Sequence, residues 1–353
     1  MQENIKKTLF LDAKNYGTDI YDNAIKTASE ILIKGGVAAI PTETVYGLAA
    51  NALDEDAVAK IFKAKNRPAD NPLIVHIDSL KAVYPLVKEF PQKAKILAEH
   101  FWPAALTIIM EKSDKIPSIV SGGLDTVALR IPDNKPALDL LKKCGLPLAA
   151  PSANLSGRPS PTKAIHVLND MNGRIEAILD GGHCEIGVES TVISFAEKIP
   201  VILRPGKVTK EEIEKIIGLV KLHKAVTDEI NIKEKAISPG MKYKHYSPVN
   251  PVIIINSDAK DYINFLNEKF NEENNIIALC FNEDIDKLNC KTVSFGFEDD
   301  SLSQASTLYD SLIATNDFEN HTIYARMPKK QGIGLAVFNR LLRAAGNKII
   351  DIF

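Results

Sequence analysis

Polar side chains that can bind an anion stand where apolar runs of this sequence stop. The apolar run Val37–Ile40 ends at Pro41 and is followed at once by a cluster of hydroxyl groups, and Lys65 and Arg67 stand one residue apart where a helical pattern ends. A guanidinium group binds phosphate or carboxylate through two parallel hydrogen bonds, and an ammonium group adds a compact positive charge. We therefore predict an anion-binding site. Its candidate side chains are those of Thr42, Thr44, Lys65, Arg67, Asn71, His76, Thr126, Arg130, Ser152, Asn154, Ser190 and Arg204.

The sequence lacks the motifs of several common reaction classes. It contains neither GxGxxG nor GxxxxGK[ST], so no dinucleotide or Walker-type phosphate loop is indicated, and it contains neither HExxH nor GxSxG. Carboxylates are scarce near the candidate side chains, with Glu43 and Glu189 the nearby ones. This pattern is typical of a site that positions and neutralises anions without a covalent nucleophile.

Most of these residues, taken singly, also have an ordinary structural explanation. Lys65 at a helix end can interact with the helix dipole, and a histidine inside an apolar run, such as His76, is more often part of the core than a ligand. Ser152 and Asn154 can simply form a turn. Arg130 is harder to explain, because arginine is seldom buried in an apolar strand without a partner. The joint placement of these residues at strand ends favours a binding site.

Length and composition describe a globular protein of two domains. The chain has 353 residues, of which 45% are hydrophobic and 25% charged, with a formal net charge of -2 that does not predict general nucleic-acid binding. The four cysteines form no CxxC pair, so we expect reduced thiols and no zinc site. The first residues are too polar for a signal peptide and no apolar stretch is long enough for a membrane span, so we expect a cytoplasmic protein without membrane association.

The spacing of apolar residues predicts which elements position the site. Residues 1–220 read as an α/β domain with one twisted sheet, 221–250 as a linker, and 251–353 as a smaller Rossmann-like unit with strand–helix alternation. The expected helices are 21–34, 54–64, 91–101, 137–143, 162–168 (capped by Thr162), 209–218, 260–270, 302–314 and 334–345. The expected strands are 37–40, 106–110, 126–131, 146–150, 177–180, 192–195, 201–203, 252–255, 276–281, 292–295 and 322–325.

Six motifs and the linker together resemble a known family. PTETVYGLAANA, KAKNRPADNPLIVHI, TVALRIP, APSANLSG, ESTVI and LRPG resemble the YrdC-like domain, in the same order. SPGMKYKHYSP and the later GIGLAVFNRLLRAA resemble the two-domain Sua5 form of that family. The resemblance implies a YrdC-like twisted mixed sheet with helices, followed by a smaller Rossmann-like Sua5 domain. One departure is Asn66, which stands where the family often has glycine.

The resemblance implies a threonylcarbamoyl-AMP synthase. Such an enzyme converts L-threonine, bicarbonate or CO2, and ATP into threonylcarbamoyl-adenylate and pyrophosphate. The product serves the N6-threonylcarbamoyladenosine (t6A37) modification of ANN-decoding tRNA, in which a separate protein complex performs the transfer. Mg²⁺ is expected to arrive with ATP, held mainly by phosphate oxygens, so no metal ligands from the protein are expected.

The family's roles pass to matching positions of this sequence. For L-threonine they imply Thr42, Thr44, His76, Arg130, Ala150 and Ser190. For ATP they imply Lys65, Arg67, Asn71, Thr126, Ser152, Asn154, Ser160 and Arg204, with Lys65 and Arg67 also near the one-carbon unit. In the linker, Lys242, His245 and Tyr246 are expected to form a lid that excludes water from the labile adenylate.

Two other functions remain open at this point. One is a non-catalytic RNA-binding module, because YrdC-like domains present a basic concave surface. The other is a carbamoyl transferase that uses carbamoyl phosphate, since a related domain occurs in hydrogenase maturation, although the zinc-finger motifs and acylphosphatase region of that system are missing from this sequence. Pyrophosphate release that requires ATP, threonine and bicarbonate distinguishes the synthase from both.

Overall fold

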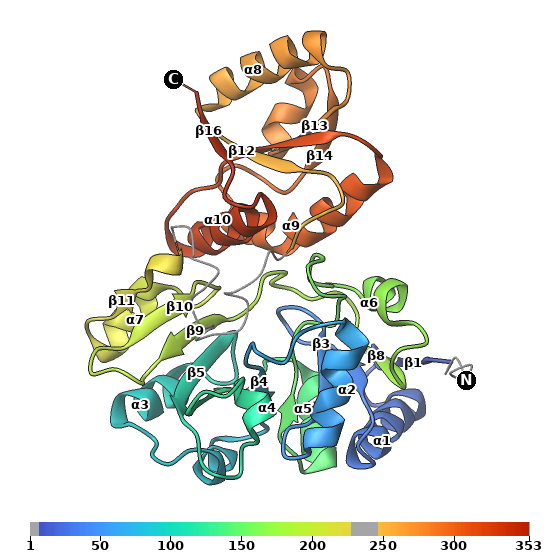
Figure 1. Cartoon of the computed structure of the whole chain (residues 1–353), viewed down its shortest axis with the longest axis vertical. Coiled ribbons are helices and arrows are strands. Elements are labelled where there is room, and N and C mark those ends of the chain that lie inside the picture. The colour runs from blue at the N-terminus through green and yellow to red at the C-terminus, as the bar shows by residue number, and fades with distance from the viewer. Residues whose placement is uncertain (1–6, 227–245, 353) are drawn as a thin grey trace. The chain divides into compact units, whose positions relative to one another are not determined.

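The chain divides into two compact units (Figure 1). The computed structural model describes residues 7–226 and 246–352. The first unit comprises Met1–Ser156, Ser160–Glu185 and Glu189–Lys242, and the second comprises Gly157–Pro159, Ile186–Val188 and Tyr243–Phe353. The predicted linker boundaries at residues 221 and 250 stay a prediction, because most of the segment between them lies outside the described residues.

A mixed sheet forms the centre of the first unit. Parallel and antiparallel pairs alternate irregularly along it: β4 pairs parallel with β6 but antiparallel with β7, and β5 pairs antiparallel with β6. In spatial order its strands are β1 (Leu9–Asp12), β8 (Ala177–Asp180), β2 (Ala38–Ile40), β3 (Gly47–Asn51), β7 (Leu148–Ala149), β4 (Ile74–His76), β6 (Thr126–Arg130), β5 (Leu106–Glu111), β9 (Thr191–Ser194), β10 (Val201–Arg204) and β11 (Lys221–Leu222).

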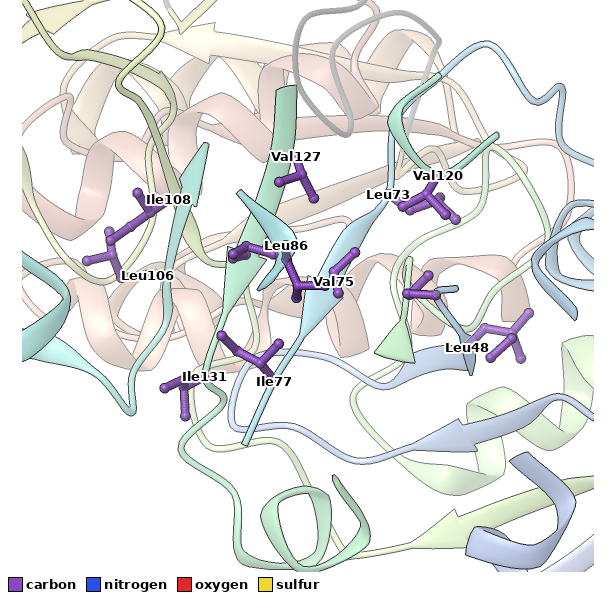
Figure 2. Packing of buried hydrophobic residues seen from close by; sticks show 14 of the residues in the cluster. Leu48, Leu73, Val75, Ile77, Leu86, Leu106, Ile108, Val120, Val127 and Ile131 are labelled. Atoms are coloured by element: carbon purple, nitrogen blue, oxygen red, sulfur yellow. The ribbon is translucent and has the colours of Figure 1, made fainter. Parts of the chain in front are cut away.

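Helices of the first unit cover one face of this sheet along most of its width. They pack on an apolar cluster to which the strands contribute side chains such as Val75, Ile108 and Val127 (Figure 2). The helices of this face are α2 (Glu55–Lys65), α3 (Gln92–Phe101), α4 (Ser118–Ser121), α6 (Ala164–Met171) and α7 (Lys210–Ile217), and short 3-10 turns occur at Leu80–Ala82, Tyr84–Leu86 and Lys224–Val226.

The opposite face of the sheet is divided into two halves. Over β1, β8, β2, β3 and β7 it is covered by α1 (Asp19–Ile33) and α5 (Lys135–Cys144), which pack on residues such as Ile40 and Leu148. Over β4, β6, β5, β9 and β10 the same face carries a second, small apolar cluster. Its members are Ile74, Ile109, Ala128, Val192, Val201 and Leu203.

Local sequence signals explain where several helices begin and end. The side chain of Asp54 accepts hydrogen bonds from two backbone N–H groups at the start of α2, and Asn66 ends this helix in the left-handed conformation with φ of 51°. Thr209 and Glu212 form the predicted capping box of α7. Residue identity therefore explains both ends of α2 and the start of α7.

The second unit is a parallel α/β sheet. Its strands are, in spatial order, β14 (Lys291–Ser294), β13 (Ile276–Cys280), β15 (Thr322–Arg326), β12 (Val252–Asn256) and β16 (Ile349–Asp351). Its helices are α8 (Ala259–Glu272), α9 (Ser301–Ala314) and α10 (Gly332–Ala344), with 3-10 turns at Asn282–Lys287 and Thr315–Asp317. All four strand pairs are parallel, but the order differs from that of dinucleotide-binding folds.

The predicted fold class is confirmed, with local corrections. Strands β1, β3, β4, β11 and β16 are not among those expected. Strand β3 has the sequence GLAAN, and Gly, Ala and Asn are depleted in strands. The helix expected to start at Thr162 begins instead at Ala164, with Lys163 as N-cap and no side-chain cap. Of the helices in the described part of the chain, none combines the length and apolar character needed to cross a membrane.

Candidate active site

Strand register places His76 and Arg130 side by side. These residues are direct partners across the parallel pair β4–β6. Since side chains alternate along a strand, Thr126 and Arg130 share the face of His76, on which Ile74 and Ala128 form an apolar floor. Thr126 begins β6 and Arg130 ends it, roughly 13 Å apart. These three candidate residues therefore lie along one sheet face and are not confined to the carboxyl ends of strands.

Arg130 is buried and has three partners. The residue is 3% exposed, and its Nη2 lies 2.7 Å from Oε2 of Glu43. Nη1 donates to Oγ1 of Thr44 at 3.0 Å and Nε donates to the carbonyl of Ala104 at 3.3 Å. Arg130, which the sequence marked as unusual for an apolar strand, is thus paired and held in one orientation.

The two threonines after β2 have different roles in the turn. The hydroxyl of Thr42 accepts from the N–H groups of Thr44 and Val45 and donates to the carbonyl of Val45. Its one proton is thereby used, so the hydroxyl of Thr44, 2.8 Å away, donates to it. Thr42 builds the turn, and Thr44 links that turn to Arg130.

His76 is a buried imidazole with open hydrogen-bond positions. The residue is 3% exposed, and neither ring nitrogen makes a hydrogen bond of normal geometry within the described structure. Burial, and next the charge of Arg130, lower the pKa of His76 to about 3. The ring is therefore neutral near pH 7 and can donate or accept one hydrogen bond to a ligand.

Ser190 and Arg204 form a second polar group at the neighbouring strands. Arg204 donates from Nη2 to Oγ of Ser190 at 3.1 Å and from Nε to the Ser190 carbonyl at 3.0 Å. The Ser190 hydroxyl also lies 2.8 Å from that of Thr107 on β5. The loop after Arg204 lies tightly against this group, since a Cβ atom at Gly206 would come within 2.2 Å of the Thr191 nitrogen.

Lys65 fastens the loop that follows β7. Its ammonium donates to the carbonyls of Ser152 (2.5 Å) and Asn154 (2.6 Å), and its own carbonyl accepts from the N–H of Ser156. Burial, and then the charge of Arg67, hold the pKa of Lys65 well below its usual value. The structure thus joins three residues predicted to bind ATP, with Lys65 positioning the loop that carries the other two.

Asn71 and Ser160 differ in whether their side chains have a hydrogen-bond partner. Arg67 donates from Nη2 to the Asn71 carbonyl at 3.1 Å. The Asn71 side-chain amide is fully buried and has no hydrogen-bond partner among the described residues. The hydroxyl of Ser160, by contrast, donates to Glu189 at 2.6 Å. Of this pair, Asn71 has the free hydrogen-bonding groups that a ligand needs.

The remaining predicted residues lie in different surroundings. Ala150 follows β7, and its N–H donates to the carbonyl of Ile74 at 2.9 Å. Lys242 and His245 lie outside the described residues. Tyr246 is 5% exposed, has φ of 66°, and stacks on Tyr309 with ring centroids 5.2 Å apart.

Sequence reasoning assigned no role to three polar side chains that the structure joins to the site. Glu43 pairs with Arg130, Thr107 with Ser190, and Glu189 with Ser160. Thr107 gave a signal, because it is the polar residue inside the apolar run Leu106–Met110. Glu43 gave one as well, as an acid between two hydroxyl residues directly after a buried strand.

Two family models match consecutive parts of the chain. The Sua5/YciO/YrdC model, described as "Telomere recombination", matches residues 30–206. The model described as "Threonylcarbamoyl-AMP synthase, C-terminal domain" matches residues 208–346. Together they span both units of the structure.

Individual relatives match over nearly the whole chain. The threonylcarbamoyl-AMP synthase of Bacillus subtilis is 46% identical over 331 residues, which cover 93% of this chain and 95% of that protein. The crystal structure of Pyrococcus abyssi Sua5 complexed with L-threonine is 42% identical with a TM-score of 0.90, and covers 98% of this chain and 100% of that chain. A shorter relative, the putative threonylcarbamoyl-AMP synthase of Mycobacterium tuberculosis, is 35% identical over 185 residues, 52% of this chain and 85% of that protein.

Proposed function

This chain belongs to the Sua5/YciO/YrdC family in its two-domain form, and on that premise we propose that it is a threonylcarbamoyl-AMP synthase. It forms threonylcarbamoyl-adenylate and pyrophosphate from L-threonine, bicarbonate or CO2, and ATP. The amine of threonine takes up the one-carbon unit, and the resulting carbamate attacks the α-phosphate of ATP. All reacting partners are anionic near the reacting centre, so catalysis must overcome their mutual repulsion.

The observation that carries the proposal is the buried group around Arg130. A guanidinium held by Thr44 stands beside a neutral imidazole, His76, whose nitrogens make no hydrogen bond of normal geometry in the described structure. A fixed guanidinium binds a carboxylate, and a neutral imidazole can hydrogen-bond a hydroxyl group. L-threonine offers both groups. A solved relative with 42% identity and a TM-score of 0.90 carries L-threonine, which supports this assignment.

Lys65 and Arg67 are two further cations, and together with Asn71 they suit a nucleotide. Lys65 holds the loop of Ser152 and Asn154, Arg67 lies two residues further along the chain, and Asn71 keeps a free amide. The positive charge of Lys65 and Arg67 can offset the repulsion between carbamate and triphosphate, which is the main requirement for transfer to an α-phosphate. Within the described residues no group of three His, Cys, Asp or Glu side chains could hold a metal ion. Mg²⁺ would accompany ATP, bound by phosphate oxygens and water.

The chemistry of the product indicates which class of reaction must follow this one. A threonylcarbamoyl-adenylate is an activated acyl donor, so a separate transfer reaction must consume it. We propose that a tRNA threonylcarbamoyl-transfer complex uses it to form t6A37 in ANN-decoding tRNA, in the cytoplasm.

The test is release of pyrophosphate by the purified full-length protein. We expect release only when ATP, L-threonine and bicarbonate are all present, together with a threonylcarbamoyl-adenylate detected by mass spectrometry. Binding of tRNA with a steep salt dependence and no pyrophosphate would support the RNA-binding module instead. Turnover of carbamoyl phosphate without threonine would support the carbamoyl transferase.

A further inference from the structure

Glu43 places a carboxylate inside the group proposed to bind L-threonine. It stands between Thr42 and Thr44 in the turn after β2, and its side chain is 6% exposed. The family resemblance assigned it no role. A role for Glu43 in binding L-threonine rests on the proposed function.

The pair of Glu43 and Arg130 is charge-balanced but incompletely hydrogen-bonded. Oε2 of Glu43 lies 2.7 Å from Nη2 of Arg130, yet the two atoms are not aligned as a hydrogen bond. Oε1 of Glu43 also has no hydrogen-bond donor among the described residues. Leaving a buried polar group without a hydrogen bond costs roughly 1–3 kcal/mol, and more when the group is charged. The carboxylate therefore has room for donors from a ligand.

A zwitterionic amino acid has the two groups that complete this pair. Its carboxylate can accept from Nη2 of Arg130, which makes no hydrogen bond of normal geometry within the described residues. Its ammonium group carries three N–H donors, which suit the open oxygens of Glu43. The four charges sum to zero, so ligand binding adds no net charge to a buried site. An arginine alone would bind any carboxylate, whereas the arginine–glutamate pair recognises a carboxylate and an ammonium group together.

We propose that Glu43 binds the α-ammonium group of L-threonine while Arg130 binds its carboxylate. Glu43 thereby selects a free amino acid over a hydroxy acid or an N-acylated amino acid. It also positions the nitrogen that takes up the one-carbon unit.

The experiment compares two ligands that differ in the amino group. L-Threonine and (R)-3-hydroxybutyrate, which is threonine without its amine, are titrated by calorimetry into the full-length wild-type protein and into Glu43→Gln, without ATP. The wild-type protein should bind L-threonine at least tenfold more tightly than the hydroxy acid. In Glu43→Gln, which keeps the side-chain shape and removes the charge, this ratio should fall below about threefold.

Asp133→Asn is the matched control. Asp133 is an exposed acid whose pKa is raised, first by partial burial and next by the charge of Glu43, so its charge acts on the same group. Removal of the Asp133 charge should leave the ratio of the affinities for L-threonine and the hydroxy acid within twofold of the wild-type ratio. An equal loss of affinity for both ligands in Glu43→Gln would show a structural role and overturn the proposal.

The wild-type ratio also tests the proposal without any variant, so failure of Glu43→Gln to fold does not leave the question open. A ratio near one in the wild-type protein would overturn it. Two results together would overturn this inference alone. In the first, the wild-type protein releases pyrophosphate with threonine. In the second, the ratio of its affinities for L-threonine and (R)-3-hydroxybutyrate is unchanged in Glu43→Gln. A tenfold ratio without pyrophosphate release would overturn the proposed function alone.

Discussion

Unsatisfied hydrogen-bonding groups separate the candidate residues into two kinds. Thr42 and Ser160 use their hydroxyl protons on Val45 and Glu189, and both are buried. His76 and Asn71 are equally buried, but their side-chain nitrogen and oxygen atoms make no hydrogen bond of normal geometry in the described structure. Buried polar groups are nearly always hydrogen-bonded in proteins, so the second kind indicates contact with a ligand and the first kind indicates support of the local structure.

The low pKa of His76 predicts an acid-sensitive first unit. In the folded protein its pKa is about 3, against roughly 6.5 in the unfolded chain, so below about pH 6.5 the unfolded state takes up a proton that the folded state does not. Stability is therefore lost as the pH falls from 6.5 toward 3. In His76→Leu, the decrease in unfolding free energy between pH 7 and pH 5 should be smaller than in the wild-type protein by about 2 kcal/mol.

This effect can be measured with the chain's single tryptophan. Trp102 is buried in the first unit and donates to the carbonyl of Leu106, so its fluorescence in urea reports unfolding of that unit. His100→Gln, at an exposed position on α3, is the control and should leave the pH dependence unchanged. Equal pH dependence of His76→Leu and wild-type stability would contradict a depressed pKa.

Lys65 and Arg67 should be required for activity, and both alanine variants should remain folded. Lys65→Ala removes the ammonium that holds the carbonyls of Ser152 and Asn154, and Arg67→Ala removes the second cation. We expect each variant to lose at least about tenfold in ATP-dependent pyrophosphate release, from lost charge stabilisation of about 1.4 kcal/mol or more. The Trp102 signal should remain native. Lys63→Ala, on an exposed position of the same helix, should keep wild-type turnover, and wild-type turnover in the first two variants would contradict the site assignment.

At the scale of elements, the sequence was informative where side chains act locally. The ends of α2 and α7 follow from Asp54, Asn66 and the Thr209–Glu212 box. Pairing register is a long-range property, so the direct neighbourhood of His76 and Arg130 across β4 and β6 could not be read from spacing. For the same reason the partner of Arg130 was not foreseen, although an arginine in an apolar strand predicted that a partner exists.

Asn66 illustrates how an element fixes a functional pair. Its left-handed conformation ends α2 directly between Lys65 and Arg67, and asparagine and glycine both adopt this conformation readily. Asn66→Gly should therefore keep stability within about 0.5 kcal/mol of the wild-type protein, whereas Asn66→Val should lose about 1–2 kcal/mol. Urea unfolding followed by Trp102 fluorescence measures both. Equal stability of the valine and glycine variants would contradict the importance of this helix end.

At the scale of the whole molecule, the first unit has what an independent domain needs. It has its own mixed sheet with one large apolar cluster on one face and the cluster under α1 and α5 on the other. The Mycobacterium tuberculosis relative aligns with 52% of this chain over 85% of its own length, so a family member exists that is no longer than this unit. The six motifs all fall within this part of the sequence, and the second unit repeats none of them.

Truncation after about residue 235 separates folding of the first unit from the role of the linker. Because its core is self-contained, the truncated chain should unfold cooperatively in urea with the native Trp102 signal at the start. We predict that it still releases pyrophosphate but loses Lys242, His245 and Tyr246, the residues expected to exclude water from the labile adenylate. The ratio of intact threonylcarbamoyl-adenylate to pyrophosphate should then fall at least about threefold below that of the full chain, since each released adenylate hydrolyses in bulk water. His245→Ala in the full chain should also lower the ratio of intact adenylate to pyrophosphate. An unchanged ratio in both the truncated chain and His245→Ala would refute a lid.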